Sequence, residues 1–334
     1  MSKRATANEV ATLAGVSKWT VIRAFTPGAS ITEASRAKVL AAAKKLHYSP
    51  NLLARSLATN LTHQVAILVD DFTNPHKLPF LERLTAALQA EGRIASLINI
   101  NTANDHFTAM MHAEQRQVDA IILFGTAFRD DMLHDKRFSK SFPDLYVLAR
   151  DSQTEIVTAI NCDTELAMRE ICDYLATGNY KSPCFMSGPK TLSTALGRRH
   201  YFMDFWANKL GREIPEITSE RYSALSGSQS MRNFLELCRR EKRSIDLIMC
   251  ENDILACGAK DVIMHDFGMR VPEDIAIVGF DNIELSGAPP YQITTYEQPL
   301  DEMVSAIVDM ILGRRPKKPV VFPGKLIVRQ STQQ

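Results

Sequence analysis

The first 48 residues show apolar positions at helical spacing, separated by turn signals. Val10 and Ala14 fall on one face of a predicted helix, and Thr6-Ala-Asn-Glu9 before them has the form of a capping box. Gly15 follows as a stop signal, and Ser17 is a good N-cap for a second helix. The pattern therefore predicts a helix, a tight glycine turn and a second helix.

The second predicted helix carries Val21, Ala24 and Phe25 on one face, and a third is expected from about Thr32 to Leu46. Its predicted apolar stripe consists of Ala34, Val39, Leu40, Ala43 and Leu46.

In such a three-helix unit, residues at the start of the second helix point away from the core and can enter the major groove of DNA. Arg23 can donate two hydrogen bonds to a guanine, and Lys18 can reach a base or a phosphate. Trp19 can lie against a thymine methyl group. The alternative is that Lys18 and Arg23 only solvate the helix while Trp19 packs in the core.

After Tyr48 the chain predicts a short helix that Pro50 opens, with Leu53 and Leu57 on one face. Alone, such a helix is too short to be stable in water. If it folds on binding, Leu57 can act as a wedge between base pairs in the minor groove, and Arg55 can follow the groove.

Beyond Thr62 the pattern changes to short apolar runs that alternate with amphipathic helices, such as one from Phe80 to Ala90. This alternation is typical of βαβ units and a parallel sheet. Two sets of strands indicate two lobes, and ligands of open parallel sheets bind beyond the carboxyl ends of the strands. The predicted strands are 65–69, 94–100, 118–124 and 145–149 in the first set and 183–187, 245–250 and 275–280 in the second.

Charge divides the chain at the same place. The first 62 residues hold nine Lys/Arg and two Asp/Glu, a net charge of +7, whereas the remainder holds 30 basic and 36 acidic residues, a net charge of −6. A basic head suits contact with phosphates. The longest apolar run, Ala120–Phe124, is far shorter than the roughly 20 residues that cross a bilayer, and no apolar signal segment follows Met1. We therefore expect a cytoplasmic protein without a membrane partner.

An enzyme and a periplasmic binding protein are the alternatives to a DNA-binding protein. An enzyme is disfavoured because the chain has no phosphate-binding loop, nucleophile elbow or zinc-protease motif, and its eight histidines are scattered. Six cysteines without a C-x-x-C pair predict buried free thiols, and we expect no metal and no cofactor. A periplasmic sugar-binding protein is disfavoured by the basic head and the lack of a signal segment.

The head and hinge motifs, Glu9-Val-Ala-Thr-Leu-Ala-Gly-Val-Ser17 and Tyr48-Ser-Pro-Asn-Leu-Leu-Ala-Arg-Ser-Leu57, resemble the lactose-repressor (LacI/GalR) family. The resemblance implies that the second helix reads a half-site in the major groove and that Leu57 intercalates at the centre of a pseudo-palindrome. Ile22 departs from the family, which usually has a serine there. The expected DNA contacts are Thr6, Ser17, Lys18, Trp19, Thr20, Ile22, Arg23, Asn51, Ala54, Arg55 and Leu57.

The body resembles the same family over nearly its whole length. The motifs that carry the resemblance are Gly188-Pro189, Ser193-Thr-Ala195 with Arg198 and Phe202, Glu251-Asn-Asp-Ile-Leu-Ala-Cys-Gly-Ala259, Val278-Gly-Phe-Asp-Asn282, Thr294-Thr-Tyr-Glu-Gln-Pro299 and Leu326-Ile-Val-Arg-Gln-Ser-Thr332. The resemblance implies that Arg198 and Asp281 grip a small-molecule effector from opposite sides of a cleft. The expected effector contacts are Asp71, Phe72, Asn74, Arg150, Thr194, Arg198, Asn252 and Asp281.

Departures from the family leave the effector open. His76-Lys77 replaces two aromatic residues that commonly follow Asn-Pro, Ala149 stands where sugar-binding members often carry Asp or Asn, and Cys162-Asp163 replaces a usual Asp-Asn. If Arg150 and Arg198 both faced the cleft, an anionic ligand such as a sugar acid would be favoured.

The sequence thus predicts an α/β protein with an all-α helix-turn-helix head (1–48), a hinge helix and linker (49–62), and a periplasmic-binding-protein-like body (63–334) with doubly wound parallel sheets. The N-lobe is expected at about 63–160 and 291–323, and the C-lobe at about 161–290 and 324–334. We expect a transcriptional regulator, most simply a repressor, that binds a pseudo-palindromic operator as a homodimer and responds to a small polar metabolite. No heptad helix follows the last strand, which favours a dimer over a tethered tetramer.

Overall fold

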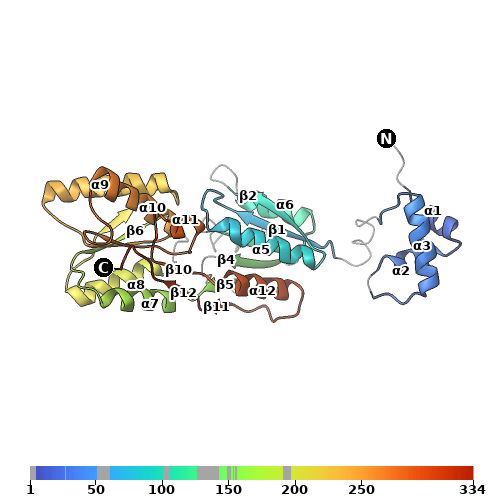
Figure 1. Cartoon of the computed structure of the whole chain (residues 1–334). Helices are drawn as coiled ribbons and strands as arrows, with labels where there is room; N and C mark the ends of the chain where they lie inside the picture. The colour runs from blue at the N-terminus through green and yellow to red at the C-terminus, as the bar shows by residue number, and fades with distance from the viewer. Residues whose placement is uncertain are drawn as a thin grey trace. The chain divides into compact units, whose positions relative to one another are not determined.

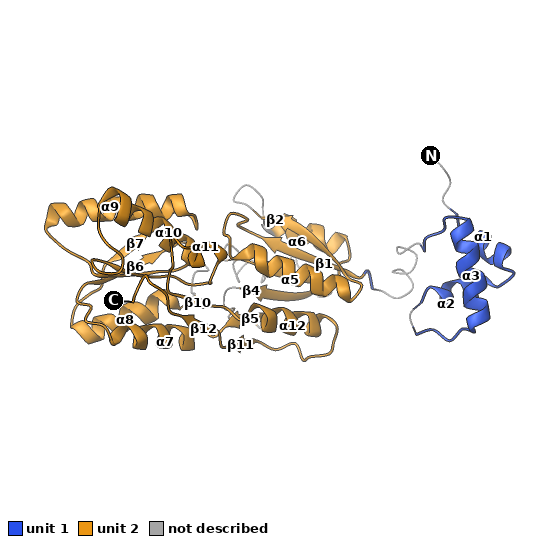
Figure 2. Ribbon diagram, in the orientation of Figure 1, with its two compact units in different colours: residues 1–62 blue, residues 63–334 orange. Residues whose placement is uncertain are grey.

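The computed structural model describes residues 5–26, 28–50, 61–100, 106–125, 143–148, 152, 154, 156–190 and 197–333. The chain separates into two compact units, Met1–Thr62 and His63–Gln334 (Figure 2).

The described residues of the first unit form three helices, α1 (Ala7–Ala14), α2 (Lys18–Ala24) and α3 (Glu33–Lys45). The capping box at α1 is confirmed: the Glu9 N–H donates to Thr6 Oγ1 (3.3 Å), and the Thr6 N–H donates to Glu9 Oε2 (2.6 Å). Gly15 ends α1 with a left-handed φ of 64°, which favours glycine. The side chains of Ser17 and Thr32 cap α2 and α3.

The core of this unit is small and consists of valine and alanine. Val10, Val21 and Val39 are fully buried, with Ala42 and Ala43 beside them. The predicted stripe of α3 is partly wrong, because Leu40 and Ala34 lie on the surface. One helical residue turns the chain by about 100°, so a core that buries Val39 on a narrow stripe leaves Leu40 outside.

The second unit contains two parallel sheets. The N-lobe sheet has the order β11-β5-β4-β3-β1-β2, and every pair is parallel (Figure 1). Helices α5 and α12 pack on one face and α6 on the other. The elements are β1 (Gln64–Val69), α5 (Lys77–Ala90), β2 (Ile94–Asn99), α6 (His106–Gln115), β3 (Ala120–Phe124), β4 (Asp144–Leu148), β5 (Val157–Cys162), α12 (Leu300–Ile311) and β11 (Val320–Phe322).

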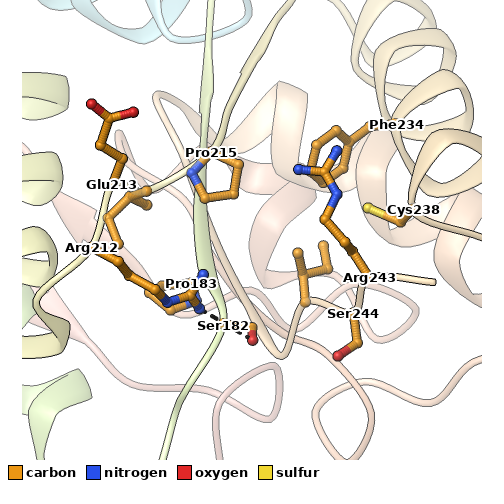
Figure 3. Close-up of a pocket in the computed structure, with 11 residues that line it drawn as sticks. Ser182, Pro183, Arg212, Glu213, Pro215, Phe234, Cys238, Arg243 and Ser244 are labelled. Carbon is orange, nitrogen blue, oxygen red and sulfur yellow. Dashed lines mark hydrogen bonds between the residues drawn. The ribbon is translucent and has the colours of Figure 1, made fainter. Parts of the chain in front are cut away.

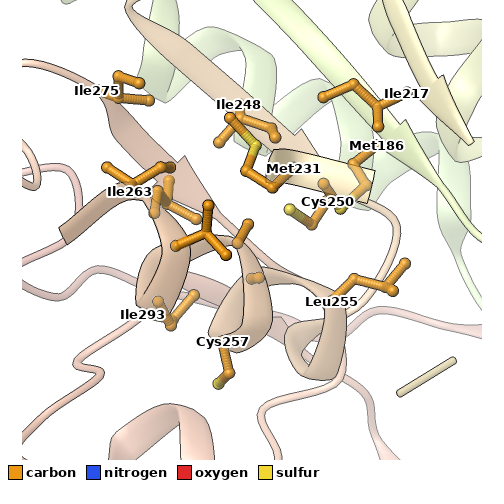
Figure 4. Packing of buried hydrophobic residues seen from close by; sticks show 14 of the residues in the cluster. Met186, Ile217, Met231, Ile248, Cys250, Leu255, Cys257, Ile263, Ile275 and Ile293 are labelled. Carbon is orange, nitrogen blue, oxygen red and sulfur yellow. The ribbon is translucent and has the colours of Figure 1, made fainter. Parts of the chain in front are cut away.

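The C-lobe sheet has the order β7-β6-β8-β9 and is also parallel. Alternate side chains of its strands pack on α7 and α8 on one face and on α9 and α10 on the other, where Ile248, Leu255 and Ile263 meet (Figure 4). The elements are α7 (Thr164–Ala176), β6 (Pro183–Ser187), α8 (Arg198–Leu210), β7 (Glu216–Thr218), α9 (Ala224–Glu241), β8 (Leu247–Cys250), α10 (Asp253–Asp261) with the π-helical turn η2 (Val262–Asp266), β9 (Ala276–Val278) and α11 (Glu284–Gly287).

The chain crosses between the lobes more than once. After β10 (Thr295–Glu297) it supplies α12 and β11 to the N-lobe, and then returns with β12 (Lys325–Ile327), which pairs antiparallel with β10. The predicted parallel sheets are therefore confirmed, while strand β5 and the three-residue strands β7, β10 and β11 were not predicted.

All six cysteines are free and buried, as predicted. None of the helices in the described ranges is long and apolar enough to cross a membrane.

Candidate functional site

The first candidate surface is the outer face of α2. Trp19 is 72% exposed and Ile22 is 42% exposed, and Lys18 and Arg23 are also exposed. Val21 and Ala24 of the same helix point into the core. Burial of Trp19 in the core, the alternative reading of the sequence, is therefore wrong. An indole and an isoleucine held in solvent between two cations form a surface suited to the edges and sugars of DNA.

The polar residues around α2 form hydrogen bonds at the ends of the helices. The Thr20 N–H donates to Ser17 Oγ (3.1 Å), and the two hydroxyl oxygens lie 3.0 Å apart. Thr6 is held in its capping box on α1. These hydroxyl groups orient the helices and remain at the surface, except that Thr20 is half-buried.

Six predicted contacts lie outside the residues that the structure describes. They are Asn51, Ala54, Arg55 and Leu57 for DNA, and Arg150 and Thr194 for the effector.

The second candidate site lies at the carboxyl edge of the C-lobe sheet, around Arg198. This arginine is the first residue of α8 and is only 7% exposed. Its Nη1 donates to the Glu251 carbonyl oxygen (2.8 Å), and the guanidinium lies 3.6 Å from the centre of the Phe280 ring. Its Nη2 is 4.0 Å from Asp281 Oδ1, and its buried Nε has no hydrogen-bond partner among the described residues. A buried guanidinium with spare donors is prepared to receive acceptor oxygens.

Arg198 and Asp281, which the family resemblance placed on opposite sides of a cleft, belong to the same lobe. Arg198 begins the helix after β6, and Asp281 follows β9, so both lie at the same edge of one parallel sheet. A ligand bound by both residues would contact two charged side chains of the same lobe.

Asp281 sits in an unusual backbone segment. Asp281 has a φ of 105° and Asn282 a φ of 51°, backbone conformations that residues other than glycine rarely adopt. The segment is held because the Asp281 N–H donates to the Tyr296 carbonyl (2.9 Å) and the Ile283 N–H donates to Asp253 Oδ2 (2.9 Å). Burial raises the pKa of Asp253 to about 7, against hydrogen bonds that lower it.

Glu251 supports the site from behind and was not predicted. Its carboxylate accepts from the Gly188 N–H (2.6 Å) and from the Tyr222 hydroxyl (3.1 Å), and burial raises its pKa. A Cβ atom on Gly188 would lie 2.2 Å from the Tyr222 ring, so glycine is required there. The motif around residue 251 pointed to Asn252, but nothing in the sequence indicated that Glu251 would turn toward Gly188.

Four further predicted effector residues have structural partners. Asp71 Oδ1 accepts from the Thr73 N–H and hydroxyl in a tight turn, and Phe72 packs on the N-lobe core. Asn74 is buried and accepts from the His76 N–H (3.3 Å). Asn252 caps α10 through the Leu255 N–H (3.2 Å). Asn74 and Asn252 lie beside two residues of the candidate site, His76 and Glu251. Phe72 instead packs against the core of the N-lobe.

His76 and Gln298 complete the surroundings of Asp281. The Gln298 side-chain nitrogen donates to Asp281 Oδ1 (2.7 Å), and His76 Nδ1 lies 3.8 Å from the same oxygen. In the sequence, His76 stands out only as a departure from the family pattern. Gln298 was not predicted as a residue of the site.

A cavity of 380 Å³ lies elsewhere in the C-lobe (Figure 3). It is lined by Pro183 at the start of β6 and by Ile245 before β8, so it opens at the amino edge of the sheet, opposite Arg198. Its Arg212 already donates to the Lys181 carbonyl (2.6 Å). The site around Arg198 is therefore the better candidate for a polar ligand. Among the described residues, no group of His, Cys, Asp and Glu is placed to hold a metal ion.

Comparison with known proteins agrees with this division. Residues 6–51 match the family described as bacterial regulatory proteins, lacI family, and residues 172–332 match the periplasmic binding protein-like domain. The chain is 27% identical over 333 residues to the HTH-type transcriptional regulator AscG of Escherichia coli K12, covering 97% of each chain. It is 27% identical over 322 residues to the ribose operon repressor of the same organism, covering 93% of each.

The fold is shared with a solved regulator. The lac repressor dimer bound to operator and the anti-inducer ONPF superposes with a TM-score of 0.85 at 23% identity, covering 99% of this chain and 100% of that one. With a lacI-type head, a periplasmic-binding-protein-like body and full-length regulator relatives, the chain belongs to the lacI family of bacterial regulatory proteins.

Proposed function

We propose that this protein is a sequence-specific repressor whose affinity for an operator is controlled by a small polar metabolite, a sugar or sugar derivative, bound at Arg198 and Asp281. The observation that carries the proposal is the buried guanidinium of Arg198, whose Nε has no acceptor among the described residues and whose Nη2 is 4.0 Å from Asp281. A fork of donors beside a carboxylate can bracket neighbouring hydroxyl groups, because hydroxyls both accept and donate.

The DNA-binding half of the proposal is supported by the exposed face of α2. Lys18, Trp19 and Arg23 share this surface, and the first 62 residues carry a net charge of +7. Electrostatic attraction brings such a head to DNA, and contacts to base edges select the sequence. Leu57 and the rest of the hinge remain a prediction from the sequence.

A homodimer fits this function, because an operator made of two half-sites needs two heads. The lac repressor structure is of a dimer, and the ribose operon repressor is named for a sugar operon. We carry both points to this chain as part of the proposal, with the cytoplasm as the place where a DNA-binding regulator works.

A thermal-shift screen of the full-length protein tests the ligand half. Sugars, sugar acids, phosphosugars, nucleosides and amino acids would each be added, since a compound that binds only the folded state raises the unfolding temperature. We expect one class to give a rise in the wild type and none in Arg198→Ala.

Arg199→Ala is the matched control. Arg199 is the next residue of α8, is half-exposed and pairs with Glu216 at 2.7 Å, so it lies outside the proposed site. The control should keep the ligand-induced rise. If Arg198→Ala kept it as well, Arg198 would not be a ligand contact.

A further inference from the structure

Three buried polar side chains link the two lobes, and we call them the His76–Gln298–Asp281 chain. His76 precedes α5 of the N-lobe, Asp281 follows β9 of the C-lobe, and Gln298 lies on the crossing segment between β10 and α12. Their residues are 6%, 5% and 7% exposed. Buried polar groups of this kind have to satisfy one another, so the direction of each hydrogen bond is constrained.

The geometry fixes which atom donates. Gln298 Nε2 lies 2.7 Å from Asp281 Oδ1 and 3.2 Å from His76 Nε2. An amide nitrogen carries two hydrogens and accepts none, and a carboxylate oxygen only accepts. Gln298 therefore gives one hydrogen to Asp281 and one to His76. His76 Nε2 has to be the acceptor, which leaves the ring proton on Nδ1, 3.8 Å from Asp281 Oδ1.

The surroundings of His76 also favour the neutral ring. Burial is the largest influence and lowers the pKa of His76, Asp281 raises it, and Arg198 and Lys77 lower it. Lys77 is paired with Asp70, and the Phe124 ring packs edge-on against the imidazole. A second proton on Nε2 would face the Gln298 hydrogens, and turning the amide would point its oxygen at Asp281.

We propose that His76 and Gln298 are positioning residues that orient Asp281 for its ligand, and that they do so only while His76 is neutral with its proton on Nδ1. The inference rests on the proposed function in one respect, that Asp281 contacts the effector. Its consequence is that acid releases Asp281 and loosens the contact between the lobes. An aromatic residue at position 76 that does not titrate, such as phenylalanine, would not give this property.

The tautomer can be measured without any ligand. Full-length protein with ¹⁵N-labelled histidine rings would be studied by long-range ¹H–¹⁵N NMR at about pH 7, where the two neutral tautomers give distinct nitrogen shifts. The His76 signal is assigned by its loss in His76→Gln and, independently, in His76→Phe. We expect a protonated Nδ1 and an unprotonated Nε2. A proton on Nε2, alone or with one on Nδ1, would overturn the proposal.

The pH dependence of stability gives a second test. Because the folded-state pKa of His76 lies below the unfolded value of about 6.5, the unfolded chain binds more protons, and stability falls as the pH drops below that value. From about pH 7.5 to about pH 5.5 the unfolding temperature of the wild type should fall by a few degrees more than that of His76→Gln, whose amide oxygen can still accept from Gln298.

His76→Phe separates positioning from simple packing. It removes the acceptor, so its unfolding temperature should already lie below that of His76→Gln at neutral pH, and it should lack the extra fall in acid. Asp253 also titrates near this site, so Asp253→Asn is the control and should keep the part of the fall that His76 causes. An equal fall in the wild type and His76→Gln would contradict the proposal.

Gln298→Glu tests the chain from its centre. A carboxylate at position 298 accepts where the amide donated, so the NMR spectrum should show His76 protonated on Nε2 at about pH 7, because the new negative charge raises its pKa. An unchanged His76 signal would contradict the geometry. These results do not depend on effector binding, so a failed ligand screen would reject the proposed function and leave the tautomer result standing.

Discussion

The two tryptophans of the chain lie in regions that are built in opposite ways. Trp19, on α2 of the head, is 72% exposed beside cations, whereas Trp206, on α8 of the C-lobe, is fully buried with Phe202 and Phe205 around it. The head is stabilised by a core of valines and alanines and by helix caps, and it exposes Trp19 and Ile22 to solvent. The body buries Trp206 and Phe202 and even the charged side chain of Arg198. One region presents a surface, and the other assembles an interior.

The largest expected effect comes from removing each indole in turn. Trp206→Ala should lower the free energy of unfolding of the body by about 3–5 kcal/mol, because it leaves a large cavity in the core. Trp19→Ala should change it by no more than about 0.5 kcal/mol and weaken DNA binding instead. Denaturant unfolding and binding to duplexes selected from a random library measure the two effects. A destabilised Trp19→Ala would mean that the head is not built as described.

A smaller effect is expected from Arg23→Ala, which sharpens the distinction between a base contact and a general charge. If Arg23 donates to a guanine, its loss should cost about 1–3 kcal/mol in affinity and relax the preference at one base pair. Lys44→Ala is the matched control, since it removes the same charge from an exposed position near the end of α3. Selection and sequencing of bound duplexes would show the difference. Equal effects of both changes would reduce Arg23 to a phosphate contact.

The smallest expected effect concerns the capping box. Thr6→Ala removes the side-chain acceptor of the Glu9 N–H and should destabilise α1 by about 1 kcal/mol. Hydrogen exchange at the amides of α1 would report it locally. Thr26→Ala is the control. Thr26 lies just beyond the end of α2, and its hydroxyl donates to the Ile22 carbonyl of that helix. This change leaves the α1 cap intact and should not alter hydrogen exchange in α1.

The head was largely predictable because its signals are local. Caps at Thr6, Ser17 and Thr32 mark each helix start within a few residues, and the exposed face follows from the buried one. Leu40 was misplaced because periodicity alone does not say how wide a stripe the neighbouring helices cover.

The body was predictable where its strands are long apolar runs, and much less so elsewhere. Strand β5 was not predicted because Thr158 and Asn161 interrupt its apolar run. Strands β7, β10 and β11 were not predicted because they are only three residues long. The site brings together residues 76, 198, 251, 281 and 298 through folding of both lobes. No spacing along the chain records that Gln298 lies between His76 and Asp281, so the family motif that contains Gln298 did not reveal its place in the site.

If the exposed head and the buried site are energetically coupled, a ligand bound at Arg198 changes the affinity of the protein for DNA. The affinity of the full-length protein for its selected duplex would be measured with and without the compound that the thermal-shift screen identifies. For the wild type we predict a change of about 5–150-fold, the size of typical allosteric coupling, and no change for Arg198→Ala. A wild type whose DNA affinity ignores that compound, or an Arg198→Ala variant that responds as the wild type does, would contradict the account.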